Sequence, residues 1–248
     1  MIKAFRYIWA VYFLLLFIVF FILFYPFFLI TLSRRKWYPI AHKLRALWGY
    51  IIMYLSGLWP STTFEQPLAK KKTYIFIANH FSYLDILSLN VQLGSYFRFM
   101  AKKELAQIPL FGIFFRTIDI SVDRKNVRES VKAFNYANAA LRAGDSLGIF
   151  PEGRIGNSVP DMTPFKQGAF KMAVENQIPI VPVVIIDNWK RLPDGGLENG
   201  GTPGRMRMVV LKPIETMNHT AADIPMLMKE SRSLIQETFN KHNHRNSK

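Results

Sequence analysis

The sequence of 248 residues contains no cysteine. Disulfide bonds, thiolate metal sites and cysteine nucleophiles are therefore excluded. Acidic residues are few, because 17 Asp and Glu stand against 32 Lys and Arg, which gives a formal net charge of +15. Half of the residues are hydrophobic and 15% are aromatic, a composition that excludes a disordered chain. A chain this basic is expected to bind an anionic partner: nucleic acid, anionic lipid or an acidic protein.

The positive charge is concentrated in the N-terminal part of the chain. Residues 1–72 hold ten Lys and Arg but only one acid, Glu65, whereas the remaining 176 residues hold 22 bases and 16 acids. Most of the excess charge therefore flanks the most hydrophobic part of the sequence. This location argues against a nucleic-acid partner, as does the lack of a base-stacking or groove-reading motif. A non-catalytic, membrane-anchored nucleic-acid binder is the alternative from another functional class.

Residues 7–33 contain no charged side chain. The run exceeds the roughly 20 apolar residues that cross a bilayer core as a helix. It is also longer than the apolar region of a cleaved signal peptide. We therefore predict a retained membrane anchor. Pro26 leaves two forms open, because residues 7–25 could span the bilayer alone, or a bent element could enter and leave the same leaflet.

A second apolar stretch, residues 46–55, is too short to span a bilayer comfortably. Trp48 and Trp59 near its ends indicate an interfacial helix, and an ordinary buried helix is the alternative. Basic residues flank both stretches and would bind an anionic membrane surface; they are residues 34–36, Lys43, Arg45 and residues 70–72. The positive-inside rule places them and the following domain on the cytoplasmic face, of the inner membrane if the protein is bacterial.

From residue 73 onward, short β-branched or aromatic runs alternate with helical patterns. The runs predict strands at 73–78, 96–100, 117–122, 146–150, 180–186 and 205–211. Helices are predicted at 83–93, 111–115, 127–143, 165–176 and 223–240. Residues 187–204 are typical of a long surface loop, and the polar tail 240–248 is expected to fray.

The alternation predicts an α/β fold in which helices flank a largely parallel or mixed sheet, preceded by the membrane-anchoring helical segment. We expect an N-terminal anchoring region at residues 1–60 and a second domain at residues 61–248.

The first candidate for chemistry is the pair His80 and Asp85, directly after the predicted strand 73–78. In one continuous helix the two would lie about 140° apart. If His80 instead lies in the turn before the helix, the Asp85 carboxylate could fold back to the imidazole. The other ring nitrogen would then be a base able to take a proton from an alcohol. The alternative is a histidine that caps the helix.

A second candidate segment, residues 150–154, also follows a predicted strand. The guanidinium of Arg154 suits a phosphate, and Gly153 lets the backbone come close to a ligand. Glu152 could orient Arg154 or bind donors at a helix start, although Pro-Glu-Gly is also a common turn.

Two further segments are less distinctive. Lys102, Lys103 and Arg124 are candidate anion ligands, or simply solvated charges. Val181 and Pro182 offer no titratable group and indicate either core or the wall of an apolar groove.

Together and in this order, the four segments resemble the 1-acylglycerol-3-phosphate acyltransferases of the glycerolipid acyltransferase superfamily. The matching residues are Asn79, His80 and Asp85 for Asn-His-x4-Asp; Lys102 or Lys103, Leu105, Gly112, Asp123 and Arg124 for the second block; residues 150–154 for Phe-Pro-Glu-Gly and Arg; and Val181 with Pro182 for the fourth. The resemblance covers residues 73–186. The chain departs from the usual pattern in having Ser121 and Val122 before Asp-Arg and no Thr before Arg154.

The resemblance implies an O-acyltransferase. A fatty acyl group would move from acyl-CoA or acyl-carrier protein to the 2-hydroxyl of 1-acyl-sn-glycerol-3-phosphate (lysophosphatidic acid), giving phosphatidic acid without a covalent acyl-enzyme. The implied roles are His80 as base, held by Asp85, and a phosphate site of Lys102 (favoured over Lys103), Arg124, Glu152, Gly153 and Arg154. No metal or cofactor is implied.

The four blocks are shared by enzymes with other acceptors, so glycerol-3-phosphate, another lysophospholipid or a lyso-aminolipid is the alternative. The sequence leaves open the acyl-chain length, the thioester donor and the oligomeric state. The other histidines, which match no block, are expected on the surface or in the tail: His42, His219, His242 and His244.

Overall fold

The computed structural model describes residues 2–156, 159–196 and 198–244. Within these residues the helices are α1 Ile2–Leu32, α2 Tyr38–Leu55, α3 Leu84–Gln92, α4 Ile113–Arg116, α5 Val127–Arg142, α6 Gly168–Asn176, α7 Asn188–Arg191 and α8 Ile224–His244, with short 3₁₀ turns η1 Arg35–Trp37, η2 Lys103–Gln107 and η3 Ala221–Asp223. The strands are β1 Leu58–Phe64, β2 Ile75–Ala78, β3 Phe97–Lys102, β4 Ile120–Val122, β5 Ser146–Ile149, β6 Ile180–Ile185 and β7 Gly204–Val210.

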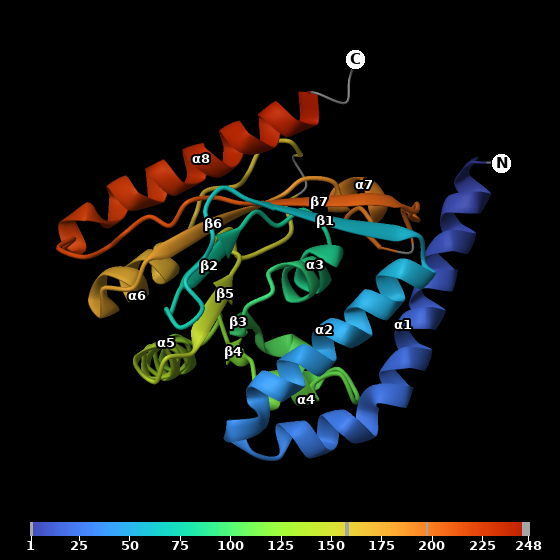
Figure 1. Ribbon diagram of the computed structural model, residues 1–248, viewed down its shortest axis with the longest axis horizontal. Helices are drawn as coiled ribbons and strands as arrows, with labels where there is room; N and C mark the ends of the chain where they lie inside the picture. The colour runs from blue at the N-terminus through green and yellow to red at the C-terminus, as the bar shows by residue number, and fades with distance from the viewer. Residues whose placement is uncertain (1, 157–158, 197, 245–248) are drawn as a thin grey trace.

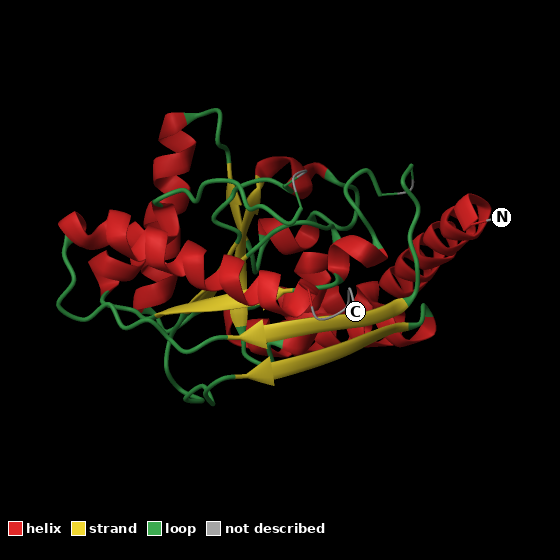
Figure 2. Cartoon of the chain, turned by 90° about the horizontal axis from the view of Figure 1, so that it is seen from above, coloured by secondary structure: helices red, strands yellow, loops and turns green. Residues whose placement is uncertain are grey.

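The strands form one mixed, seven-stranded sheet in the order β1-β7-β6-β2-β5-β3-β4 (Figure 1). Strands β6, β2, β5, β3 and β4 are parallel to one another, whereas β7 is antiparallel to β6 and parallel to β1. The sheet is strongly twisted, since the long pair β1 and β7 runs across the view of Figure 2 at a steep angle to other strands. The predicted α/β fold with helices on a mixed sheet is confirmed.

Apolar runs make the central strands, because parallel strands are covered on both faces. Every residue of β2 and β6 is buried. One face of the sheet packs on α5, α6 and α8, and the other packs on α3 (Figure 1). Pro182 is tolerated in β6 because it lies at the end of the ladder with β7, which begins at Val183, and its carbonyl accepts a hydrogen bond from Leu211.

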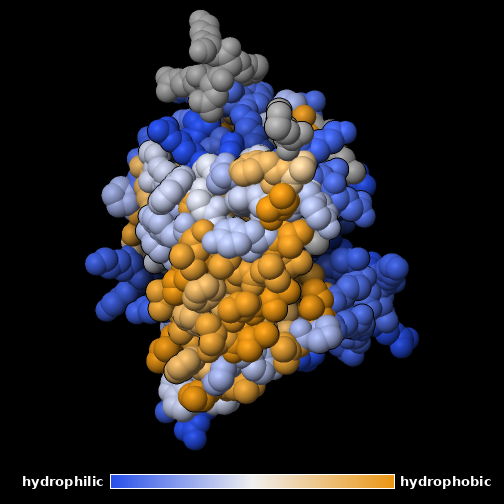
Figure 3. Space-filling view, turned by 90° about the vertical axis from the view of Figure 1, so that its right-hand side faces the viewer, coloured by the Kyte–Doolittle hydropathy of each residue, from blue (hydrophilic) through white to orange (hydrophobic). Residues whose placement is uncertain are grey.

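Helices α1 and α2 form an antiparallel hairpin that packs outside α3 (Figure 1). One face of α1 is buried against α2 and α4, through Trp9, Phe13, Phe21, Phe28 and Leu32. The opposite face is an exposed apolar surface (Figure 3). The helix continues through Pro26, and its stretch from Lys3 to Leu32 is long and apolar enough to cross a membrane. The predicted N-terminal apolar helix is therefore present.

The α2 helix has one buried and one exposed face. Its buried side includes Trp48 and Ile52, as the buried-helix alternative requires. Its other side exposes Leu47, Tyr50 and Leu55, which also suits an interface. The helix thus has features of both alternatives.

Strand β1 was not predicted from the sequence. Residues 58–64 include a proline and several polar residues. The strand is the outermost one of the sheet on its side, and such residues are tolerated in an outermost strand. The predicted loop 187–204 contains the short helix α7. Residues 240–244, expected to fray, extend α8, and the rest of that tail lies outside the described residues.

Two basic residues of α2 are buried, contrary to the sequence-based expectation. Arg45, assigned there to the membrane surface, binds the Asp119 carboxylate at 2.6 Å and the Asn90 side-chain oxygen at 2.9 Å. His42, expected on the surface, lies beside Arg45. Burial and the neighbouring guanidinium lower the pKa of His42 to about 3, so its imidazole is neutral. Asp119 also accepts a hydrogen bond from the backbone of Phe99, which ties α2 to the sheet.

Replacing Arg45 with methionine is expected to reduce the free energy of unfolding by about 3–5 kcal/mol, because Asp119 would remain buried without its cation. Chemical denaturation in detergent would measure the change. Lys43→Met, at an exposed position of the same helix, is the control. The double variant Arg45→Met/Asp119→Leu should regain much of the loss, and a single variant as stable as wild type would contradict the prediction.

Candidate active site

The carboxyl ends of the five parallel strands meet at one edge of the sheet, where α/β proteins bind ligands. The segments that follow them lie in the order of the strands: Asp187 and Asn188 after β6, His80 after β2, residues 150–154 after β5, Lys103 after β3, and Asp123 with Arg124 after β4. The sheet therefore gathers residues from the first three sequence segments at one edge, together with Asp187 and Asn188, which follow the fourth.

His80 lies in the turn between β2 and α3, and Asp85 lies in the first turn of α3. The His80 Nδ1 atom is 3.0 Å from the Asp85 Oδ2 atom. Of the two alternatives that the sequence left open, the structure therefore has the one in which the Asp85 carboxylate folds back to the imidazole. The same oxygen accepts hydrogen bonds from the backbone N–H groups of Phe81 at 2.7 Å and Ser82 at 2.8 Å.

The His80–Asp85 contact sets the chemistry of the imidazole. An ionised carboxylate can only accept hydrogen bonds, so the contact with Asp85 favours the tautomer of a neutral imidazole in which Nδ1 carries the proton and Nε2 keeps its lone pair. The Asp85 side chain is almost fully buried, whereas 12% of the His80 side-chain surface is exposed. The arrangement therefore leaves the imidazole partly accessible at the sheet edge, with the Asp85 carboxylate buried beneath it.

Glu152 fixes the backbone at His80. Its Oε1 atom accepts a hydrogen bond from the His80 N–H at 2.9 Å, and its Oε2 atom accepts two from Thr163. Burial raises the pKa of Glu152, and these hydrogen bonds oppose that shift. Of the two roles open from sequence, Glu152 binds backbone donors, and Arg154 is not among its partners in the described part of the chain.

The imidazole is also held by aromatic packing. The His80 ring stacks on Phe150, with 4.0 Å between ring centroids and 16° between planes. The preceding residue, Asn79, bonds both backbone groups of Ile185 in β6, at 2.8 and 2.9 Å. Segments on both sides of β2 therefore hold the turn that carries His80.

Two cations meet over Gly153. This residue has a φ of +75°, which favours glycine. A Cβ atom there would lie 3.1 Å from the Lys166 Nζ atom and 3.2 Å from the Arg124 Nη1 atom. The Lys166 N–H donates to the Pro151 carbonyl at 2.8 Å, which anchors the lysine to the same turn. Arg124 and Gly153, both predicted from sequence, are thus brought together, and Lys166 joins them.

The remaining predicted residues are placed less decisively. Arg154 is exposed. Lys102 pairs with Glu104 at 3.1 Å, and Lys103 pairs with Asp123 at 3.3 Å; both lysines are largely exposed. The preference for Lys102 over Lys103 stays a prediction.

Val181 and Pro182 lie fully within the buried strand β6. Among the described residues they line neither of the two cavities presented below. Their position therefore fits the core alternative better than the wall of a groove.

Two residues at the site were missed from sequence. Lys166 lies just before α6, which begins at Gly168. Its position two residues ahead of this glycine was the only feature of the sequence that could have marked it as an anion ligand. Asn188 donates to the Asp85 Oδ1 atom at 2.9 Å from 103 positions away, and no local pattern marks it.

A largely apolar cavity of about 620 Å³ lies beside the turn, between the hairpin α1–α2 and α3. Tyr83 and Leu84, which follow His80 closely in sequence, form part of its lining. Phe13, Phe17 and Phe21 from α1 line the side of the hairpin. The volume is typical of a ligand pocket.

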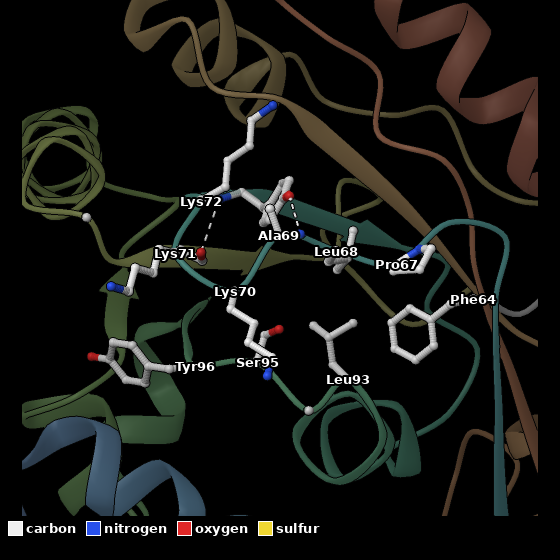
Figure 4. A pocket seen from close by; sticks show the side chains of 14 residues that line it. Phe64, Pro67, Leu68, Ala69, Lys70, Lys71, Lys72, Leu93, Ser95 and Tyr96 are labelled. Atoms are coloured by element: carbon white, nitrogen blue, oxygen red, sulfur yellow. Dashed lines mark hydrogen bonds between the residues drawn. The ribbon is translucent and has the colours of Figure 1, made fainter.

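A second cavity, of about 630 Å³, is lined by residues that do not include His80 (Figure 4). Its lining includes Tyr74 and Ser146, which precede or begin β2 and β5, so it lies toward the amino ends of these strands. Lys70, Lys71 and Lys72 form one side, and Lys72 points away toward Glu215, 2.8 Å distant. This cavity therefore lies apart from the candidate catalytic residues, which follow the carboxyl ends of the strands.

Comparison with known proteins identifies relatives. A family model described as acyltransferase matches residues 61–186. The chain is 34% identical over 194 residues to the 1-acyl-sn-glycerol-3-phosphate acyltransferase of Saccharomyces cerevisiae, across 77% of this chain and 63% of the relative. It is 33% identical over 180 residues to an uncharacterized acyltransferase of Schizosaccharomyces pombe, across 71% of this chain and 63% of the relative. The match thus spans less than two thirds of these two relatives.

The fold is shared with a solved structure. The crystal structure of the 1-acyl-sn-glycerophosphate (LPA) acyltransferase PlsC from Thermotoga maritima matches with a TM-score of 0.82 and 21% identity, across 97% of both chains. At this identity the likeness concerns the fold alone. The family model and the relatives confirm the resemblance expected from the four sequence segments. The chain therefore belongs to the acyltransferase family.

Proposed function

We propose that the protein is a membrane-bound acyltransferase that transfers a fatty acyl group from acyl-CoA or acyl-carrier protein to the 2-hydroxyl of 1-acyl-sn-glycerol-3-phosphate. The observation that carries the proposal is the His80–Asp85 contact at the sheet edge that also holds the cations Arg124 and Lys166. The name of the Saccharomyces cerevisiae relative supports the same acceptor. The product is phosphatidic acid.

His80 acts as general base in this reaction. Its Nε2 atom accepts the proton of the acceptor hydroxyl while the hydroxyl oxygen attacks the carbonyl carbon of the thioester. The carbon–sulfur bond then breaks, and the leaving sulfur takes the proton from the imidazolium as a free thiol. Asp85 holds the tautomer and stabilises the imidazolium between the two steps. The acyl group passes directly to the acceptor oxygen.

The cations over Gly153 bind the phosphate of the acceptor. Arg124 and Lys166 supply charge-assisted hydrogen bonds, and the absence of a side chain at Gly153 leaves room between them. Lys102, Arg154 and the backbone of Gly153 complete the phosphate site in this proposal. Glu152 contributes indirectly, by fixing the backbone of His80.

The apolar cavity accommodates an acyl chain. It begins beside Tyr83 and Leu84, next to the turn with His80, and its walls are mainly aromatic and aliphatic. Arg45, Asn90 and Asp119 form a polar part of its lining. Burial of a hydrocarbon chain in such a cavity is favourable by about 25 cal/mol per Å² of apolar surface.

The hairpin α1–α2 attaches the enzyme to one leaflet. The buried face of α1 extends from Trp9 to Leu32, so the helix lies against the protein along most of its length. The exposed apolar face belongs in lipid, since soluble monomers rarely expose a surface of this extent (Figure 3). The exposed basic residues 34–36, Lys43 and residues 70–72 favour an anionic, cytoplasmic membrane surface.

An acceptor panel tests the proposal. Detergent-purified protein is given oleoyl-CoA or oleoyl-carrier protein with lysophosphatidic acid, glycerol-3-phosphate, lysophosphatidylcholine or a lyso-aminolipid. We expect transfer to lysophosphatidic acid alone. Preferred transfer to another acceptor would assign the alternative within the family. A lack of transfer from both donors to every acceptor would overturn the proposed activity.

Lysine substitutions on the exposed face of α1 are expected to weaken membrane attachment. Leu15 and Ile22 lie two turns apart on that face. The double variant Leu15→Lys/Ile22→Lys should bind anionic vesicles at least about tenfold more weakly, since charges in hydrocarbon cost about 2.5–3.5 kcal/mol each. Vesicle co-sedimentation measures this. Lys substitutions at the exposed Val127 and Val131 of α5 are the control, and equal losses in both variants would contradict the assigned face.

A further inference from the structure

Asn188 connects α7 to the His80–Asp85 pair. Its side chain is buried, and its Nδ2 atom donates to the Asp85 Oδ1 atom at 2.9 Å and to the Ser88 Oγ atom at 2.8 Å. The residue lies outside the four sequence segments that suggested the activity, and no role has been assigned to it so far.

The two oxygens of Asp85 have separate partners. The Oδ2 atom accepts from His80, Phe81 and Ser82, all in the turn before α3. Among the described residues, only Asn188 donates to the Oδ1 atom. A carboxylate bonded through one oxygen can still turn about its side-chain bonds, whereas a donor on the second oxygen fixes the plane. Asn188 therefore fixes the direction in which Oδ2 meets the imidazole.

Asn188 is itself held firmly. The preceding residue, Asp187, binds the Arg207 guanidinium of β7 through two contacts, at 2.6 and 2.8 Å. The Asn188 carbonyl accepts from the Leu192 N–H at 2.9 Å. These bonds connect β7 to the catalytic pair through α7, so the amide approaches Asp85 from a supported position.

The hydrogen bonds donated by Nδ2 determine the orientation of the Asn188 side-chain amide. Its Oδ1 atom is buried without a hydrogen-bond partner within the described part of the chain, and an unpaired buried acceptor destabilises the fold. The opposite orientation would place this oxygen against the Asp85 carboxylate. Because the folded chain keeps the observed orientation, the two hydrogen bonds donated by Nδ2 stabilise the fold more than the unpaired oxygen destabilises it.

We propose that Asn188 is a positioning residue for acyl transfer, which acts by holding the Asp85 carboxylate against His80. This inference rests on the proposed function. Its effect should appear in kcat and leave the KM of the acceptor unchanged, because Asn188 has no direct part in phosphate or acyl-chain binding.

Three variants separate positioning from a general structural role. Asn188→Ala removes both bonds, and Ser88→Ala removes only the bond that does not involve Asp85. Asn188→Asp keeps the size but places an oxygen against the Asp85 carboxylate. We expect kcat to fall about 10–100-fold for Asn188→Ala, by the usual contribution of a hydrogen bond to a charged group. The fall should be larger for Asn188→Asp and less than threefold for Ser88→Ala.

Nitrogen-15 NMR of histidine-labelled protein gives a readout that does not depend on turnover. We expect the Nδ1–H signal of His80, assigned by its loss in His80→Ala, to be weakened in Asn188→Ala and Asn188→Asp but retained in Ser88→Ala. Equal effects of Asn188→Ala and Ser88→Ala on kcat and on this signal would overturn the inference, as would an unchanged kcat in Asn188→Ala. If the wild type transfers no acyl group, the proposed function fails, and the NMR comparison still decides the positioning.

Discussion

Replacing His80 with alanine is expected to reduce kcat for acyl transfer by about 10²–10⁴-fold, the usual contribution of a general base. We assign proton transfer to this imidazole because Asp85 contacts one ring nitrogen and Phe150 stacks on the ring. Without the imidazole no general base takes the proton, so the acceptor hydroxyl must attack the thioester while it is still protonated. Steady-state transfer to lysophosphatidic acid measures the change.

A second histidine of the chain provides a matched control. His219 also faces a carboxylate, with 3.6 Å between its Nδ1 atom and the Asp223 Oδ2 atom. This pair lies next to α8, outside the four sequence segments. His219→Ala should keep its turnover within twofold of wild type. Vesicle binding should persist in both variants, and retained turnover in a folded His80→Ala protein would exclude His80 as the base.

Neutralising the cations over Gly153 is expected to have the second largest effect. Arg124→Gln and Lys166→Gln should each lower kcat/KM for lysophosphatidic acid about 10–100-fold, because a hydrogen bond to a charged group contributes about 1.5–3 kcal/mol. The effect should arise mainly from KM if the phosphate is bound equally in the ground and transition states. The two side chains approach the same glycine, so their effects are expected not to add fully.

The acceptor itself separates phosphate binding from a structural effect. Monoacylglycerol carries the same hydroxyl but no phosphate, so its slower transfer should be nearly unchanged by either substitution. Arg128→Gln, at an exposed position near the start of α5, is the matched control for loss of one positive charge. Equal losses with the phosphorylated and the neutral acceptor would place the phosphate elsewhere.

Local features of the site were predictable because they depend on neighbours in sequence. The buried strands follow from continuous apolar runs such as residues 75–78 and 180–185. The His80–Asp85 contact spans five positions, so the turn and the first helical turn determine it. The common edge for Arg124 and residues 150–154 follows from parallel strands.

The residues that were missed or misplaced depend on distant contacts. Asn188 reaches Asp85 because β6 lies next to β2, and Lys166 reaches Gly153 because its segment returns to the turn after β5. Arg45 was assigned to the membrane surface because its partner, Asp119, is 74 positions away and gives no local sign of an ion pair. Strand β1 lacked a signal because edge strands need no apolar pattern.

The pairing of β1 with β7 has a consequence for how the chain matures on the ribosome. Leu58 pairs with Gly204, 146 positions later in the sequence. At about 5–20 residues per second, roughly 7–30 s of translation separate the two strands. During this interval β1 has no β7 to pair with, and an unpaired strand is a template for pairing with another chain. The apolar hairpin before it is already complete, so we expect early capture by the bilayer to protect the nascent chain from aggregation.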